Sequence, residues 1–210
     1  DVRARGVPAR VVGEERAARA VGELMEGVTL VGVFPVGPED FLCALLQRPS
    51  NGRCIPVWLP PMEGAELAAR LSGWAPRRPR PVDAMAELIR TSVDGAASLE
   101  LSSYVDGTFM ATLTLDSGVE IDLRSSDALL LAHELDMELA VDDTVAAQAA
   151  VFISEDDAKR YLQADIEVEG FNGQSVSASG DAQADADFEA LMRSLGVEDA
   201  DLGDDNPEEG

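Results

Sequence analysis

The fold of this chain is decided by residues 105–141, VDGTFMATLTLDSGVEIDLRSSDALLLAHELDMELAV. Asp106-Gly107 is a turn dipeptide, and in the run 108–115 that follows it the apolar side chains stand mostly at odd positions. This alternation is the period of a half-buried strand. After a second turn at Asp116-Ser117-Gly118, residues 119–123 alternate again. The stretch therefore predicts a β-hairpin.

A helix and a short return strand complete this stretch. Arg124-Ser125-Ser126-Asp127 opens the helix, because a serine followed by an acid suits the free N–H groups of a first turn. Residues 128–131 are apolar nearly all round, which predicts a buried helix. Together with the open strand edges of a small sheet, this apolar helix leads us to expect that a second subunit completes part of the core. A homodimer is the commonest assembly of that kind.

The same stretch closely resembles the signature of the bifunctional nuclease family, the BFN domain. Members typically show a DGTF strand, an acidic or polar strand, an R-P-S-D-A-I-like helix start and a short V-P-I-like strand. Ser125 replaces the proline of the helix start. The matching residues are Asp106, Gly107, Thr108, Phe109, Arg124, Ser126, Asp127 and Ala128.

The resemblance extends upstream and covers roughly Val28 to Ile153. Residues 55–59, IPVWL, resemble the family's L-P-I-W-I strand, and Glu63 stands where a glutamate follows that strand. One departure concerns a T-H-D run, for which this chain has Pro81-Val82-Asp83. If that run binds a metal or transfers a proton, activity is impaired here.

The resemblance implies a phosphodiesterase that acts on DNA and RNA. An alternative of a different class is a non-catalytic oligomeric or regulatory binding protein that keeps the fold.

Charge separates the chain into two parts. Residues 1–153 hold 23 acids and 13 bases, a net charge of −10, and residues 154–210 hold 17 acids and 3 bases, a net charge of −14. The charge distribution thus predicts an acidic tail at the end of the chain. An acidic protein repels a phosphate backbone unless it has a local basic patch or a bound cation. The net negative charge therefore argues against sequence-independent binding of nucleic acid. It does not exclude a nuclease that binds a divalent cation.

Cys43 and Cys54 stand on segments predicted to be neighbouring strands and have no CxxC spacing. We expect two free, reduced core thiols rather than a disulfide. No apolar run reaches the ~18 residues of a membrane span, and no signal-peptide pattern is present. The expected location is the cytoplasm, without a membrane partner.

The predicted fold is α+β: a bent, mostly antiparallel sheet with packed helices, followed by an acidic flexible tail. Residues 25–164 are expected to form the nuclease-like domain. Residues 1–24 read as an extension upstream of a start at Met25, the other interpretation being an amphipathic helix from Glu14 to Leu24. Residues 165–210 are expected to be a linker and tail that are largely disordered. Outside 105–141, strands are predicted at 28–33, 41–47, 53–59 and 97–104, and helices at 62–71, 82–93, 142–150 and 154–162.

Carboxylates and arginines are the candidates for chemistry. The single histidine, His133, lies among leucines of the predicted helix, where we expect a structural role. Nucleases without histidine usually bind Mg²⁺ or Mn²⁺ through Asp and Glu, because the cation neutralises phosphate and generates hydroxide. Further acids that could serve are Glu66, Asp83 and Glu120.

We select Asp122, Asp127 and Glu63 as catalytic and metal-binding acids, and Arg124 as a phosphate ligand. Asp122 and Asp127 flank one strand-to-helix corner, whereas Glu63 follows from the family resemblance alone. The basic, proline-rich loop 74–81 adds Arg77, Arg78 and Arg80 as substrate-binding residues. The competing interpretation is that Glu63, Asp83 and Asp127 are only helix-start acids that stabilise a dipole.

Overall fold

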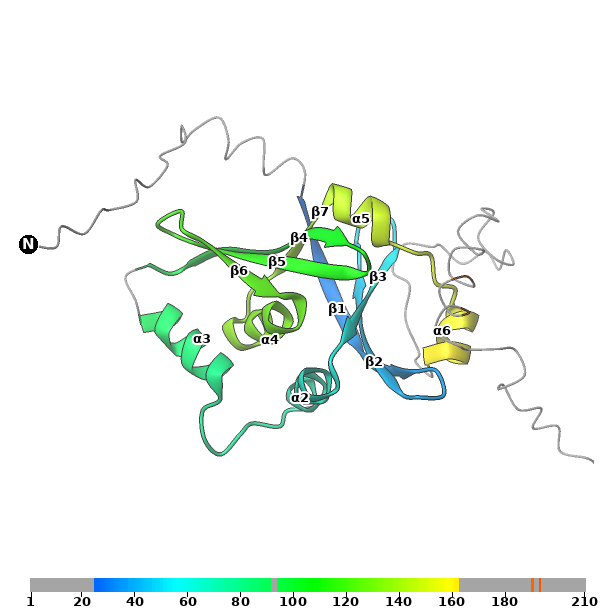
Figure 1. Cartoon of the computed structure of the whole chain (residues 1–210), viewed down its shortest axis with the longest axis horizontal. Helices are drawn as coiled ribbons and strands as arrows, with labels where there is room; N and C mark the ends of the chain where they lie inside the picture. The colour runs from blue at the N-terminus through cyan, green and yellow to red at the C-terminus, as the bar shows by residue number, and fades with distance from the viewer. Residues whose placement is uncertain (1–24, 92–93, 163–189, 191–192, 194–210) are drawn as a thin grey trace, which may run out of the picture.

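The computed structural model describes residues 25–91, 94–162, 190 and 193. This part of the chain forms an α+β structure, as predicted, with one mixed sheet of seven strands in the order β3-β2-β1-β7-β4-β5-β6 (Figure 1). Only β4 and β7 pair in parallel among these strands. The strands are β1 (Met25–Val36), β2 (Phe41–Gln47), β3 (Cys54–Leu59), β4 (Ala96–Val105), β5 (Thr108–Leu115), β6 (Glu120–Arg124) and β7 (Leu139–Asp142). The helices are α2 (Pro61–Leu71), α3 (Pro81–Thr91), α4 (Ser125–Leu135), α5 (Asp143–Ala149) and α6 (Glu155–Leu162).

The hairpin, helix and return strand predicted for residues 105–141 are confirmed. Asp106 and Gly107 have φ angles of 49° and 79°, the left-handed pair that a tight two-residue hairpin requires. β5 then pairs antiparallel with β4 and β6. After α4, β7 lies between β1 and β4. The return strand therefore joins the two halves of the sheet.

The sheet changes partners along β1. Its residues 25–28 pair with β7, and residues 29–36 pair with β2, with a register shift between Leu30 and Gly32. The strand predicted at 28–33 is longer than predicted: it begins at Met25 and continues through Pro35 to Val36. Pro35 lies opposite Leu42 of β2, beyond the point where pairing with β7 stops at Val28. Its missing N–H group therefore interrupts no ladder.

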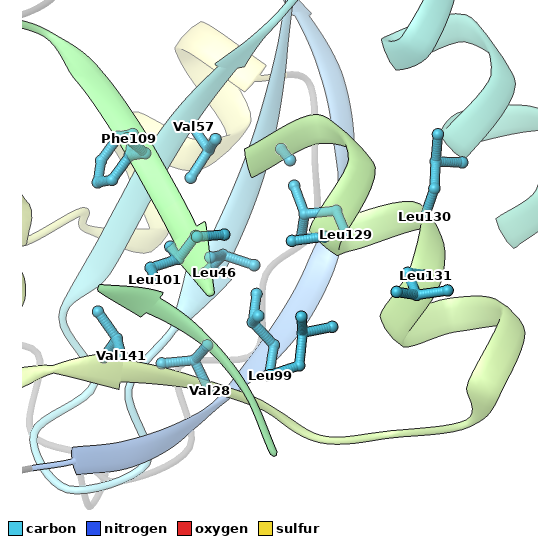
Figure 2. Packing of buried hydrophobic residues seen from close by; sticks show 14 of the residues in the cluster. Val28, Leu46, Val57, Leu99, Leu101, Phe109, Leu129, Leu130, Leu131 and Val141 are labelled. Carbon is cyan, nitrogen blue, oxygen red and sulfur yellow. The ribbon is translucent and has the colours of Figure 1, made fainter. Parts of the chain in front are cut away.

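α4 forms the centre of the larger hydrophobic core. Residues 128–131 are all buried, and Leu129 and Leu131 pack toward the β-strands near Leu99 (Figure 2). Helices α2 and α3 cover other sides of α4 and contribute Leu67, Ala86 and Ile89 to the same core. The apolar helix is thus completed within the chain, and the argument that it needs a second subunit is wrong.

A smaller core lies on the other face of β2. Ala44 and Leu46 face the larger core, whereas Cys43 and Leu45 face α6, which contributes Ala158 and Leu162. Burial on both faces explains why β2 is apolar along most of its length.

No helix in the described part of the chain is long and apolar enough to cross a membrane. The predicted extension 1–24 and nearly all of the predicted tail 165–210 lie outside the described residues.

Candidate functional site

Arg124 joins two carboxylates from different helices. Its Nε and Nη2 atoms donate to the two carboxylate oxygens of Asp127 at 2.7 and 2.9 Å. Its Nη1 atom lies 3.1 Å from Oε1 of Glu63. The Arg124 side chain is 63% exposed, whereas Glu63 and Asp127 are 25% and 34% exposed. The solvent-accessible guanidinium of Arg124 therefore lies between two carboxylates, and we call the group Glu63, Arg124 and Asp127 the Arg124 corner.

The corner is built by two parallel helices. Glu63 lies in the first turn of α2, and Asp127 lies in the first turn of α4. Neither helix has a side-chain cap at its start, and the first residue of α2, Pro61, has no N–H group. α2 can lie close to the sheet because Gly64 has no side chain: a Cβ there would lie 2.8 Å from Leu42 Cδ1.

The other predicted site residues are distributed more widely. Asp122 is exposed on β6, opposite Thr112 of β5, and its carboxylate makes no hydrogen bond or ion pair with a residue that the structure describes. Arg77 and Arg78 are exposed on the loop between α2 and α3. Arg80 is engaged instead: its Nη1 lies 2.9 Å from Glu66 Oε2, and its backbone N–H donates to Asp83.

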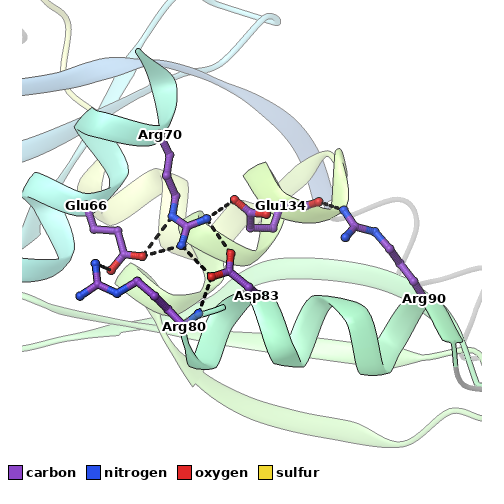
Figure 3. Close-up of polar contacts among 6 residues, drawn as sticks. All are labelled: Glu66, Arg70, Arg80, Asp83, Arg90 and Glu134. Carbon is purple, nitrogen blue, oxygen red and sulfur yellow. Dashed lines mark hydrogen bonds and ion pairs between the residues drawn. The ribbon is translucent and has the colours of Figure 1, made fainter. Parts of the chain in front are cut away.

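A second charged cluster ties α2, α3 and α4 together (Figure 3). Arg70, only 4% exposed, is its centre. Its Nη2 donates to Glu66 at 2.6 Å, and its Nη1 donates to Asp83 at 2.8 Å and also to Glu134. Arg90 donates to the backbone carbonyl oxygen of Glu134. Three carboxylates from three helices thus compensate one buried guanidinium.

Arg70 and Arg124 together set how α2 lies against α4. Arg124 links the first turns of the two helices, and Arg70, in the last turn of α2, reaches Glu134 near the end of α4. Two cross-links at corresponding ends hold the helices side by side and parallel. Their positive N-terminal ends therefore converge at Arg124.

Arg70 was not among the residues predicted to form a site. Two signals could have revealed it: the i, i+4 spacing from Glu66, and its place on the face of α2 that buries Gly64 and Leu67. A base on an apolar helix face has to find acids from other elements.

The hydrogen bonds within the two clusters shift the pKa values of the groups that form them. Hydrogen bonding to Asp127 and Glu63 raises the pKa of Arg124, and hydrogen bonding to Asp83, Glu66 and Glu134 outweighs burial and raises that of Arg70. The Arg70 hydrogen bond in turn holds the pKa of Asp83 below its ordinary value. Both arginines therefore stay charged.

His133 lies apart from this corner. It is exposed in the last turn of α4 and lines a pocket of about 300 Å³ with Leu30, Leu71 and Met137. The pocket is mainly apolar and contains neither Glu63 nor Asp127.

Metal donors at the corner are few. Within the described ranges, no three His, Cys, Asp or Glu side chains are grouped so as to hold a metal ion. A cage made of protein ligands alone is therefore not formed by these residues. Mg²⁺, however, is commonly held by one or two carboxylates together with substrate phosphates, and Glu63 and Asp127 bring two carboxylates to one guanidinium.

Comparison with known proteins supports the resemblance to the bifunctional nuclease family that residues 105–141 show. Two proteins of Mycobacterium tuberculosis, uncharacterized protein MT1877 of strain CDC 1551 / Oshkosh and uncharacterized protein Rv1829 of strain ATCC 25618 / H37Rv, are similar to this chain. Each is 29% identical over 160 residues, which is 75% of this chain and 97% of the relative. A family model described as Bifunctional nuclease domain matches residues 44–154, more than half of the chain, including Glu63, Arg124 and Asp127. The chain belongs to the bifunctional nuclease domain family.

Proposed function

We propose that this protein hydrolyses phosphodiester bonds of DNA and RNA at the Glu63–Arg124–Asp127 corner. The observation that carries the proposal is the exposed Arg124 guanidinium, placed by two carboxylates where two helix N-termini converge. A planar guanidinium matches the geometry of a phosphate, and helix N-termini favour a bound anion. Membership of the bifunctional nuclease domain family supports the choice of a nucleic-acid substrate.

In the proposed reaction, a water molecule attacks phosphorus and the bond from phosphorus to the leaving sugar oxygen breaks. Glu63 accepts the proton of the attacking water, and a second water protonates the leaving oxygen. The hydroxide that this second water becomes takes the proton from Glu63, which returns to its ionised form. Arg124 binds the non-bridging oxygens and stabilises the negative charge that develops on them. Asp127 orients Arg124 through its two hydrogen bonds.

A divalent cation, Mg²⁺ or Mn²⁺, is part of the proposal. Glu63 and Asp127 would hold it together with substrate oxygens, with Asp122 as a further carboxylate on the strand that leads into the corner. The cation would supply charge neutralisation and a more acidic bound water.

The test is cleavage of labelled DNA and RNA by highly purified protein, with Mg²⁺, with Mn²⁺ and with a chelator. Arg124→Gln should reduce the rate about 10²-fold or more. Glu87→Gln, an exposed acid on α3, is the matched control and should cleave at the parental rate. Equal cleavage by the parent, Arg124→Gln and Glu87→Gln would indicate a contaminating nuclease. Absence of cleavage by the parent would refute the proposal.

The non-catalytic alternative is favoured by one observation: the carboxylates of Glu63 and Asp127 both contact an arginine. In that case Arg124 is a structural link and the corner is an anion-binding surface. The alternative predicts binding of oligonucleotides that stays unproductive under every metal condition.

The proposal includes a homodimer in the cytoplasm. β6 is an edge strand with Ile121 38% exposed, and such an edge can pair with another copy. Cys43 and Cys54 are free thiols, which is usual in a reducing compartment. Sedimentation that shows a monomer at micromolar concentration would refute the dimer.

A further inference from the structure

We infer that the loop between α2 and α3, residues 72–80, is a binding track for single-stranded nucleic acid, with a base stacked on Trp74 and phosphates bound by Arg77 and Arg78. The inference rests on the proposed function, because it names the form of substrate that would reach the Arg124 corner.

Both ends of the loop are held in place. At the end of α2, Gly73 has a φ of 83° and its N–H donates to Arg70 O at 2.8 Å, while the Trp74 N–H donates to Ala69 O at 3.0 Å. These two bonds form a Schellman motif, which fixes the backbone that carries the indole. At the other end, Arg80 is held by Glu66 and Asp83 (Figure 3).

The side chains between these two ends are available to a ligand. Trp74 is 48% exposed, and Arg77 and Arg78 are exposed and contact no acid among the residues that the structure describes. Their situation contrasts with that of Arg70, Arg80 and Arg124, each of which pairs with acids. An exposed indole, followed three and four residues later by guanidinium groups that contact no described acid, is the usual combination for single strands: bases stack on the ring and arginines follow the backbone.

The loop is also stiff. Pro76 and Pro79 stand within it and Pro81 follows it, and each proline restricts the backbone angle φ to one value. The residues that would bind a ligand therefore lose little conformational freedom when they do so.

The loop leads toward the proposed site. The end of α2 at Leu71 lies eight residues from Glu63, about 12 Å along the helix axis at a rise of ~1.5 Å per residue, and Trp74 follows that end. Arg80 contacts Glu66, one helical turn from Glu63. Arg77 and Arg78 stand in the chain between Trp74 and Arg80. A bound strand of a few nucleotides would extend from the indole to that corner.

The test uses the full chain with a labelled twelve-nucleotide thymidine single strand, in a chelator so that cleavage does not intervene. Trp74→Ala should weaken binding roughly 5- to 100-fold, the usual effect of one lost stacking contact, and leave the salt dependence unchanged. The double variant Arg77→Ala/Arg78→Ala should reduce the slope of log K against log salt by about 1.4, because each single-strand phosphate contact contributes about 0.7. Leu88→Ala removes a 67% exposed side chain from α3 and should bind like the parent.

A second measurement reports on the ring directly. In a Trp58→Phe variant, Trp74 is the remaining tryptophan, and the single strand should quench its emission. A duplex of the same length should quench it far less, because its bases are already stacked and paired.

The results separate this inference from the proposed hydrolysis. A strand that is bound through Trp74 but never cut with Mg²⁺ or Mn²⁺ supports the track and refutes the hydrolysis. Cleavage and binding unaffected by Trp74→Ala would overturn the track alone. The track is also overturned if no single strand binds, or if the Trp74 signal appears only with phosphatidylserine vesicles.

Discussion

The guanidinium of Arg124 contacts Glu63, a residue 61 positions earlier in the chain, at a distance of 3.1 Å. The contact joins the start of α4 to the start of α2, and Asp127 holds the same guanidinium from the other side. Two first-turn acids that could each have served only a helix dipole are thus assembled around one exposed base. This relationship makes the corner a candidate site rather than two unrelated helix starts.

Asp127→Asn tests the corner. If the site is catalytic, the variant should lose about 10²-fold or more in cleavage rate, with the melting temperature nearly unchanged. If Asp127 is only a helix-start acid, stability should fall by about 0.3–1 kcal/mol and turnover should stay the same. Cleavage rate and thermal melting of this one variant decide between the two roles. Undiminished cleavage would remove Asp127 from the site.

Arg70→Ala should be strongly destabilising. The change leaves Glu66, Asp83 and Glu134 with no shared cation in a largely buried position, and loss of one partner from such a group costs about 3–5 kcal/mol. Chemical denaturation measures this loss. Arg78→Ala, which removes an exposed arginine, is the matched control and should stay within about 0.5 kcal/mol. Equal stability of the two variants would mean that the cluster contributes nothing.

Low pH should reduce the contribution of Arg70 to the free energy of unfolding. The hydrogen bond from Arg70 lowers the pKa of Asp83, so the stability gained from Asp83 is fully present above the ordinary aspartate pKa of about 3.9 and is lost as the pH falls through the lowered value. The stability difference between the parent and Arg70→Ala should therefore shrink below about pH 4. Urea denaturation at pH 7 and pH 3 provides the comparison, and a pH-independent difference would contradict the ion-pair account.

Glu100→Gln should stabilise the protein at neutral pH. Burial, together with Glu120 and Asp142, raises the pKa of Glu100, so its proton is bound more tightly in the folded state. That contribution to stability is present below the ordinary glutamate pKa and is lost as the pH rises through the raised value. The variant should melt on the order of a few degrees higher than the parent at pH 7 and close to it at pH 4. A lower melting temperature at pH 7 would show that the carboxylate is stabilising.

Cys43 and Cys54 should be almost unreactive in the folded protein. Burial raises the pKa of each thiol to about 12, and the thiolate is the reactive form. At pH 8 an aromatic disulfide reagent should modify them roughly 10³-fold more slowly than an exposed thiol, whereas in denaturant both should react at once. Rapid modification of the folded chain would indicate that β2 and β3 open readily.

Much of the fold could be predicted from the sequence because its signals are local. Asp106-Gly107 required left-handed angles that only a tight turn provides, and the alternation after it placed Phe109, Ala111 and Leu113 in the core. The helices predicted at 62–71 and 142–150 are α2, which begins at Pro61, and α5, which Asp142 caps by accepting a hydrogen bond from Thr144 N–H at 2.8 Å. Each of these outcomes depends on neighbours a few residues away, which a single sequence displays.

Other features were decided only by the tertiary structure, because they depend on contacts between residues that are far apart in the chain. Pro35 was tolerated within β1 because no strand pairs with its other side there, and residues 128–131 needed no second subunit because α2 and α3 cover α4. The sequence identified Glu63, Arg124 and Asp127 through motif and resemblance, but their contact arises only when α2 and α4 lie parallel on the sheet. Arg70 holds them so through Glu134, 64 positions away, and no local periodicity encodes which acid a buried base will meet.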